Sequence, residues 1–134
     1  MAVTDGPTLE QVIKGPSIVI HCPKELLDQM IPYVRKMHTT NGLFDEALKS
    51  TVTMEQAEDR VINFLKNECG LKKGKWPIAG SSCHVDKKFI EKDMPRLHKF
   101  LHYRIIDLSS VFELTKRWLP DLANEARQFT YEKL

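Results

Sequence analysis

Residues 77–110 decide the fold, and they read PIAGSSCHVDKKFIEKDMPRLHKFLHYRIIDLSS. The run at 77–82 is short and apolar and ends in small residues, while the run at 103–107 contains two consecutive isoleucines, so both predict buried strands. Between them, the sequence pattern predicts one helix over 86–92 and a second helix over 96–101. This alternation of strand and helix is typical of an α/β layer domain.

The N-terminal part of the chain has strand character. Short β-branched runs at 1–4, 11–14 and 17–21 are separated by turn residues, among them the Asp-Gly-Pro at 5–7, which predicts two or three antiparallel strands. Strands first, followed by alternating helices and strands, predict an α/β fold with a mixed sheet flanked by helices. We expect a single domain over residues 1–134.

Helical periodicity follows these strands. Apolar residues three and four positions apart predict a helix over 24–38 that Pro32 interrupts, and a short helix over 43–48 comes next. Thr53 and Gln56 have the spacing of a capping box, which predicts the start of the clearest helix in the chain.

The C-terminal part is also predicted to be helical. Ser109 or Ser110 is expected to cap a helix that runs through Trp118. Its apolar face comprises Val111, Leu114 and Trp118, and a more weakly patterned helix follows.

The charge of the chain is nearly balanced. Of its 134 residues 42% are apolar or aromatic, which is enough for one core. Lys and Arg number 20 against 18 Asp and Glu, and the resulting net charge of +2 excludes a polybasic binder while leaving room for a local phosphate site. The three cysteines have no CxxC spacing, and we find no signal-peptide pattern and no apolar run of about 18 residues. We therefore expect a reducing, soluble compartment and no membrane partner.

Two carboxylates stand where the predicted strands of residues 77–107 end. Asp86 follows a group of small residues and as a ligand would suit Mg²⁺ or Mn²⁺, which prefer oxygen. From spacing alone we favour the alternative, an ordinary first-turn carboxylate stabilised by the helix dipole. Asp107 precedes two serines, and we favour a capping or supporting role for it over direct metal ligation.

A histidine, a tyrosine and an arginine are consecutive at 102–104. Arg104 and Tyr103 are suited to holding a phosphate, and the alternative is a polar strand edge. Alternation along a strand predicts that Tyr103 points to the side opposite His102 and Arg104. Nearby His84 has no metal-site partner at a fixed spacing, and Lys87 and Lys88 are interpreted as a solvated helix face.

Collinear motifs carry a resemblance to a known family. The most specific are GSSCHVDKKFI at 80–90, LHYRIIDLSS at 101–110 and RWLP at 117–120, and earlier segments agree in the same order. Together they resemble the oligoribonucleases, small homodimeric 3′-to-5′ exoribonucleases of the DEDDh group with an RNase H-like fold. The resemblance implies hydrolysis of very short RNA oligomers to mononucleotides, with two divalent ions, Mg²⁺ or Mn²⁺, held by four acids, and a histidine as general base.

The resemblance assigns roles to individual residues. Asp86 matches the third of the four acids and is thus implied to be catalytic and a metal ligand. His102, Tyr103 and Arg104 match the segment that caps the terminal phosphate of the substrate, and in the family this tyrosine comes from the partner subunit. Asn41 stands near the phosphate end, where the family has a serine.

Departures from the family pattern predict impaired activity. We expect the strand with the first two acids, which is central in the family's sheet, to lie before Met1, and the helix with the histidine and last acid to lie after Leu134. The chain alone is therefore expected to be impaired or inactive. The alternatives are a non-catalytic module that binds short RNA or dimerises, including with a full-length copy, and a plain interaction domain. The expected compartment is the cytoplasm, with the mitochondrion as the alternative.

Overall fold

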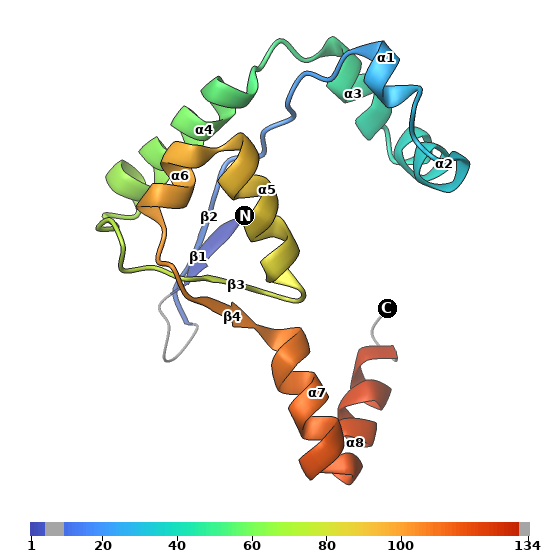
Figure 1. Cartoon of the computed structure of the whole chain (residues 1–134), viewed down its shortest axis with the longest axis vertical. Coiled ribbons are helices and arrows are strands. Elements are labelled where there is room, and N and C mark those ends of the chain that lie inside the picture. The colour runs from blue at the N-terminus through green and yellow to red at the C-terminus, as the bar shows by residue number, and fades with distance from the viewer. Residues whose placement is uncertain (5–9, 132–134) are drawn as a thin grey trace. The chain divides into compact units, whose positions relative to one another are not determined.

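The chain divides into two compact units. The computed structural model describes residues 1–4 and 10–131, and the units comprise residues 1–72 and 73–134. Figure 1 labels their helices and strands. The turn predicted at 5–7 lies outside the described residues.

The first unit begins with a two-stranded antiparallel ladder. Strand β1 (Ala2–Thr4) pairs with β2 (Val12–Lys14), with Val3 opposite Ile13, which confirms two of the predicted N-terminal strands. The run at 17–21 is not a strand. Instead, the Ser50 hydroxyl donates to the carbonyl of Val19 (2.6 Å), and the backbone N–H of His21 donates to the carbonyl of Val52 (2.8 Å). The hydrogen-bonding partners of this run therefore lie in the loop at residues 50–52 and not in a neighbouring strand.

Four α-helices follow in the first unit, and their boundaries agree closely with the sequence pattern. The predicted interrupted helix is present as α1 (Lys24–Leu27) and α2 (Pro32–Thr40), with Pro32 at the start of α2, where its missing N–H costs little. Helix α3 spans Leu43–Lys49.

Helix α4 (Met54–Asn63) begins with the predicted capping box. Gln56 N–H donates to the Thr53 hydroxyl (3.2 Å) and Thr53 N–H donates to the Gln56 side chain (3.1 Å). The helix continues into the π-helical turn η1 (Phe64–Glu68), in which the Cys69 N–H reaches the Phe64 carbonyl (3.1 Å). Phe64 and Leu65 are buried there at 2% and 3% exposure, so this turn places the main core side chains of the unit.

The second unit is built on a parallel crossover. Strand β3 (Ile78–Gly80) pairs in parallel with β4 (Ile105–Asp107), and α5 (Cys83–Asp93) and α6 (Pro95–Phe100) make the connection between them. Parallel neighbours require such a crossover, and helices commonly provide it. Cys83, Leu97 and Phe100 are buried where these helices pack.

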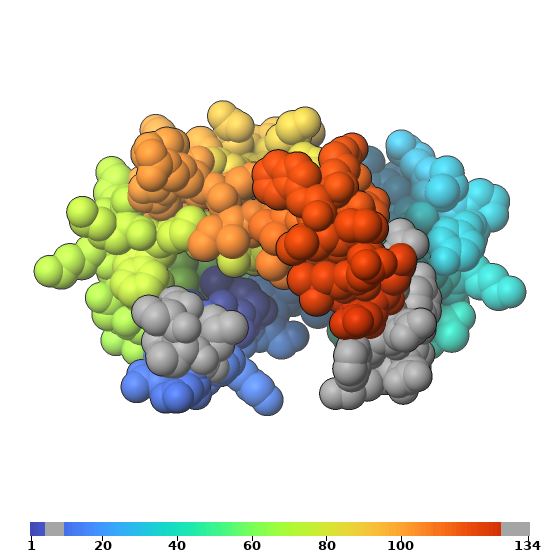
Figure 2. Space-filling view, turned by 90° about the horizontal axis from the view of Figure 1, so that it is seen from below, coloured from blue at the N-terminus to red at the C-terminus, as the bar shows by residue number. Residues whose placement is uncertain are grey.

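Helices α7 (Leu108–Trp118) and α8 (Pro120–Tyr131) complete the second unit and pack against each other. The apolar face predicted for α7 is largely exposed, because Val111, Leu114 and Trp118 are 55%, 43% and 72% accessible. Figure 2 shows the surface of α7 in orange-red, facing the viewer. Within the described part of the chain, no helix combines the length and the apolar character needed to cross a membrane.

The α/β fold class is confirmed. In the described residues the strands form two separate ladders, one antiparallel and one parallel, and helices account for most of the remaining ordered chain. The two strands of the parallel ladder end at the same edge, where Asp107 is the last residue of β4 and Asp86 lies in the first turn of the helix that follows β3.

Candidate functional site

The site is centred on the end of the parallel ladder. Gly80 and Asp107 are paired as the last residues of their strands, and α5 starts three residues after Gly80. The connection is tight because Ser82 has a left-handed backbone (φ 56°, ψ 27°), which is uncommon for any residue except glycine. The N–H of Ser82 donates to Asp107 Oδ1 at 2.9 Å, which ties this turn to the neighbouring strand.

Asp107 is the hub of the hydrogen bonds at this edge. Its side chain is only 7% exposed, and Oδ1 also accepts from the N–H (3.0 Å) and the hydroxyl (2.6 Å) of Ser109. Its Oδ2 accepts from His84 Nδ1 at 2.9 Å. The Ser109 hydroxyl, followed by the His84 imidazole, holds the pKa of this carboxyl well below its usual range.

These contacts define Asp107 as a capping residue. It is the N-cap of α7, which confirms the predicted capping role and shows that the prediction of Ser109 or Ser110 as the cap was wrong. The Asp107 side chain reaches the N–H two residues on, as N-cap side chains do, so the helix starts two residues earlier than a Ser109 cap and three residues earlier than a Ser110 cap would allow. With both oxygens engaged, Asp107 has little capacity left for a metal ion.

Asp86 differs from Asp107 in its exposure and in its hydrogen bonding. It lies in the first turn of α5, is exposed, and has no hydrogen bond or ion pair with any residue that the structure describes. A free carboxylate at this position has the hard oxygen atoms that Mg²⁺ or Mn²⁺ binds, and the helix dipole stabilises its negative charge.

One free carboxylate is not a metal centre. Among residues 1–4 and 10–131, no group of three or more His, Cys, Asp or Glu side chains is arranged to hold a metal ion. The described residues thus do not fit a complete two-metal centre, and Asp86 offers a single carboxylate.

His102, Tyr103 and Arg104 form a compact exposed stack, which we call the 102–104 stack. The rings of His102 and Tyr103 stack with centroids 4.5 Å apart, and the Arg104 guanidinium lies 5.3 Å from the Tyr103 ring centroid. The Arg104 N–H also donates to His102 Nδ1 at 3.0 Å. Tyr103 is 71% exposed, so the stack presents an imidazole, a phenol and a guanidinium to solvent.

The geometry of the stack shows that the predicted alternation of side chains at residues 102–104 is wrong. Strand β4 begins only at Ile105, so residues 102–104 lie in a bend before it and are not constrained to alternate. The sequence pattern alone extended the strand too far, because Tyr103 has high strand propensity.

Lys87 is the functional candidate that the sequence interpretation missed. Its ammonium group donates to the backbone carbonyl of Tyr103, so it is not simply part of a solvated face. Lys88, its neighbour, is exposed as predicted and makes no such contact within the described residues. The only available signal was its spacing of three residues from His84, which puts both on one side of α5.

Asn41 belongs to the first unit. It ends α2, and its side-chain oxygen accepts from the N–H of Leu43 at 3.1 Å, which shapes the turn into α3. Asn41 also lines an open pocket of about 450 Å³ together with Tyr33 and Lys36.

Comparison with protein families gives one match over nearly the whole chain. The model of a family described as "Exonuclease" matches residues 2–129.

Curated relatives were also found. "Probable oligoribonuclease" of Caenorhabditis elegans is 44% identical over 131 residues, which cover 98% of this chain and 66% of the relative. "Oligoribonuclease, mitochondrial" of Mus musculus is 43% identical, with 89% and 49% covered, and "Oligoribonuclease" of Mycobacterium sp. (strain KMS) is 46% identical, with 79% and 49% covered. The chain therefore spans between about half and about two thirds of the length of these relatives.

Proposed function

This chain belongs to the exonuclease family, and on that premise we propose that it carries part of the substrate site of a 3′-to-5′ exoribonuclease that degrades very short RNA. The family match and the relatives confirm the resemblance to oligoribonucleases noted from the sequence. The observation that carries the proposal for this chain is the 102–104 stack, an exposed group of phosphate-binding and base-stacking side chains.

The stack suits the terminal phosphate of a short oligomer. The guanidinium of Arg104 and the imidazole of His102 can donate charge-assisted hydrogen bonds to phosphate oxygens, and the exposed ring of Tyr103 offers a surface on which a base can stack. A few placed contacts of this kind are enough for a short oligomer, which agrees with the net charge of only +2. We also propose, from the family resemblance alone, that Asn41 in the first unit contacts a substrate phosphate.

Asp86 is proposed to be a metal ligand. Members of the exonuclease family are generally dependent on a divalent metal. We assign Mg²⁺ or Mn²⁺ to this site, with Asp86 as one of its carboxylates, because its oxygens are exposed and unpaired in the described structure. Since Asp86 alone does not complete a metal centre, we expect impaired turnover by this chain by itself.

Assembly and compartment follow as further parts of the proposal. The family match extends across both units, which supports a single exonuclease domain over residues 1–134. We propose that the chain forms a homodimer, or a dimer with a full-length copy, in the cytoplasm. The alternative compartment is the mitochondrion, which the name of the mouse relative gives for that protein.

A second candidate function is non-catalytic binding of short RNA. It is favoured by the contrast between the two parts of the site, since the 102–104 stack is assembled within this chain and a set of metal ligands is not found in its described residues.

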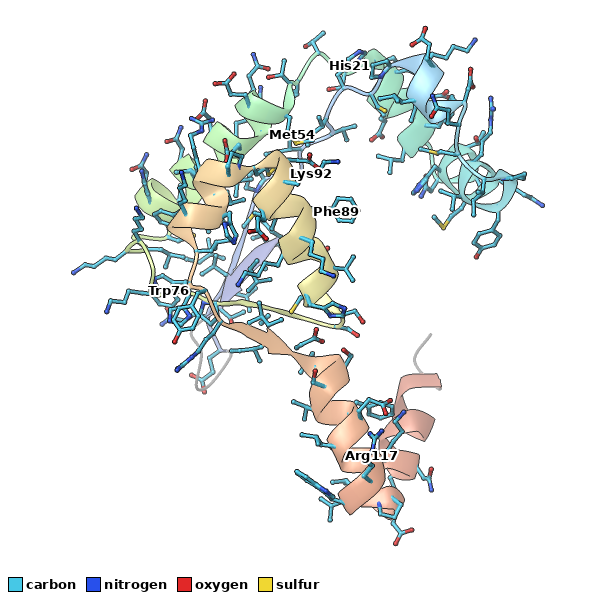
Figure 3. The ribbon with its side chains drawn as sticks, viewed as in Figure 1. His21, Met54, Trp76, Phe89, Lys92 and Arg117 are labelled. Atoms are coloured by element: carbon cyan, nitrogen blue, oxygen red, sulfur yellow. The ribbon has the colours of Figure 1, made fainter. Side chains whose placement is uncertain are left out.

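The two functions are separated by one pair of assays with a 5′-phosphorylated RNA dinucleotide. Titration calorimetry measures binding, and we expect Tyr103→Ala to weaken it about tenfold, from the loss of one stacking contact. Phe89→Ala is the matched control, because Phe89 is also an exposed aromatic side chain (62%) and projects from α5 (Figure 3), with no hydrogen bond or ring contact to any residue that the structure describes.

Turnover is then followed with Mn²⁺ present. Binding without hydrolysis supports the binding module, whereas efficient hydrolysis that Asp86→Ala abolishes supports an active enzyme. A chain that neither binds nor hydrolyses the dinucleotide refutes both functions.

A further inference from the structure

Helix α5 holds the segment 103–107 through side chains on one of its sides. The Cys83 thiol lies 3.5 Å from the Ile106 carbonyl, and His84 Nδ1 lies 2.9 Å from Asp107 Oδ2. One turn further along α5, the Lys87 ammonium donates to the Tyr103 carbonyl. The first two contacts fasten strand β4, and the third reaches the 102–104 stack beyond the strand.

Apart from the bond that the Arg104 N–H donates to His102 Nδ1 (3.0 Å), few contacts fix the shape of the stack. Tyr103 is 71% exposed, so core packing does not hold its ring in place. The His102 N–H donates to the Trp76 carbonyl at 3.0 Å, which anchors one end of the stack; Trp76 is labelled in Figure 3. Lys87 anchors the backbone further along the chain, because its ammonium group holds the carbonyl of Tyr103.

We propose that Lys87 is a positioning residue that holds the 102–104 stack in the geometry that binds the terminal phosphate of a short RNA. This inference rests on the proposed function and adds a residue that acts through the Tyr103 carbonyl rather than on the RNA itself. Lys87 follows Asp86 directly, so one turn of α5 carries both the free carboxylate and the anchor of the stack.

The role follows from the physics of an exposed binding group. A ligand binds with an apparent affinity reduced by the fraction of molecules in the competent conformation. Removing the anchor releases the peptide between Tyr103 and Arg104, so the two rings and the guanidinium spend less time together. The loss of one ordinary hydrogen bond corresponds to about a fivefold change in such a population.

The test compares three variants of the full chain. Lys87→Met removes the donor and keeps an unbranched side chain, Lys87→Arg keeps a donor, and Lys88→Met removes the same charge one residue along the helix. Calorimetry with a 5′-phosphorylated RNA dinucleotide gives Kd. Proton NMR gives the upfield ring-current shifts of His102 and Tyr103, which report on the stack without any ligand, and circular dichroism checks the fold.

We expect Lys87→Met to raise Kd about fivefold and to reduce the ring-current shifts, Lys87→Arg to restore both, and Lys88→Met to change neither. Equal weakening by Lys87→Met and Lys88→Met would show a general charge effect and overturn the inference. Weaker binding with unchanged ring shifts would mean that Lys87 contacts the RNA directly, which also overturns it.

Failure of the proposed function gives a different result. If the unmodified chain does not bind the dinucleotide, the proposed function fails, and the ring shifts alone decide whether Lys87 holds the stack. If Lys87→Met leaves the ring shifts unchanged, the positioning role is overturned even when the chain does not bind the dinucleotide.

Discussion

The left-handed Ser82 predicts that replacement by glycine stabilises the protein. A left-handed backbone costs an L-residue about 1–2 kcal/mol. Glycine escapes this cost but loses about 0.5–1 kcal/mol through the greater freedom of its unfolded chain. The Ser82 side chain makes no capping hydrogen bond, so its removal sacrifices nothing, and Ser82→Gly should raise the free energy of unfolding by about 0.5–1 kcal/mol.

Thermal unfolding followed by circular dichroism measures this gain. At about 2 cal/mol/K of unfolding entropy per residue, a chain of 134 residues should gain about 2–4 °C in Tm. The N–H of residue 82 still reaches Asp107 in the variant, so dinucleotide binding should not change.

Ser81→Gly is the matched control for this prediction. Ser82 is the only non-glycine residue with positive φ in the described part of the chain, so the backbone of Ser81 has no such strain to relieve. Ser81→Gly therefore adds only the entropy cost of a more flexible unfolded chain and should lower Tm. Ser82→Val should be the least stable variant, because β-branched residues fit the left-handed region poorly. A Tm that falls equally for Ser82→Gly and Ser81→Gly would refute the left-handed turn and the argument built on it.

Two further predictions concern stability. Thr53→Ala breaks the capping box of α4 and should lower the free energy of unfolding, measured by urea denaturation, by about 1 kcal/mol. Thr51→Ala is the control, because Thr51 is an exposed threonine just before the helix. Equal loss of stability in both variants would contradict the capping role of Thr53. Asp107→Asn removes the charge that accepts from His84 and Ser109. Because the pKa of Asp107 is lowered on folding, the stability that its charge contributes is fully present above the unfolded pKa of about 4 and is lost as the pH falls through the folded pKa. The Tm difference between Asp107→Asn and the unmodified chain should therefore be constant from about pH 5 to 6 and shrink below about pH 4. A difference that does not change with pH in this acid range would contradict the charged role of Asp107.

The edge of the parallel ladder shows how much of the site could be predicted. Asp86 was located from the sequence on the first turn of a helix after a strand, and it lies there. Asp107 was predicted to cap, and it does. Both depend on signals within a few residues of the carboxylate, and local signals of this kind are readable without a fold.

The 102–104 stack could not be predicted in the same way. Its geometry depends on where β4 begins, and that boundary depends on pairing with β3, which lies 27 positions earlier in the register. Strand β4 starts two residues later than strand propensity indicates. Tyr103 therefore lies outside the strand, is not bound by the alternation of side chains along it, and can stack on His102. Lys87 was missed for a related reason, since a long flexible side chain finds its acceptor only when two distant segments are brought together.

Local signals were enough to predict the helices, the break at Pro32, the capping box at Thr53 and all four observed strands, because capping, periodicity and proline act within a few residues. The collinear motifs were enough to identify the family. Three features could be seen only in the folded chain: residues 17–21 form hydrogen bonds with a loop, Ser82 turns left-handed towards Asp107, and Lys87 holds the carbonyl of Tyr103. Each of these depends on a donor and an acceptor that are far apart in the chain, and their meeting is set by the packing of whole elements rather than by any local preference.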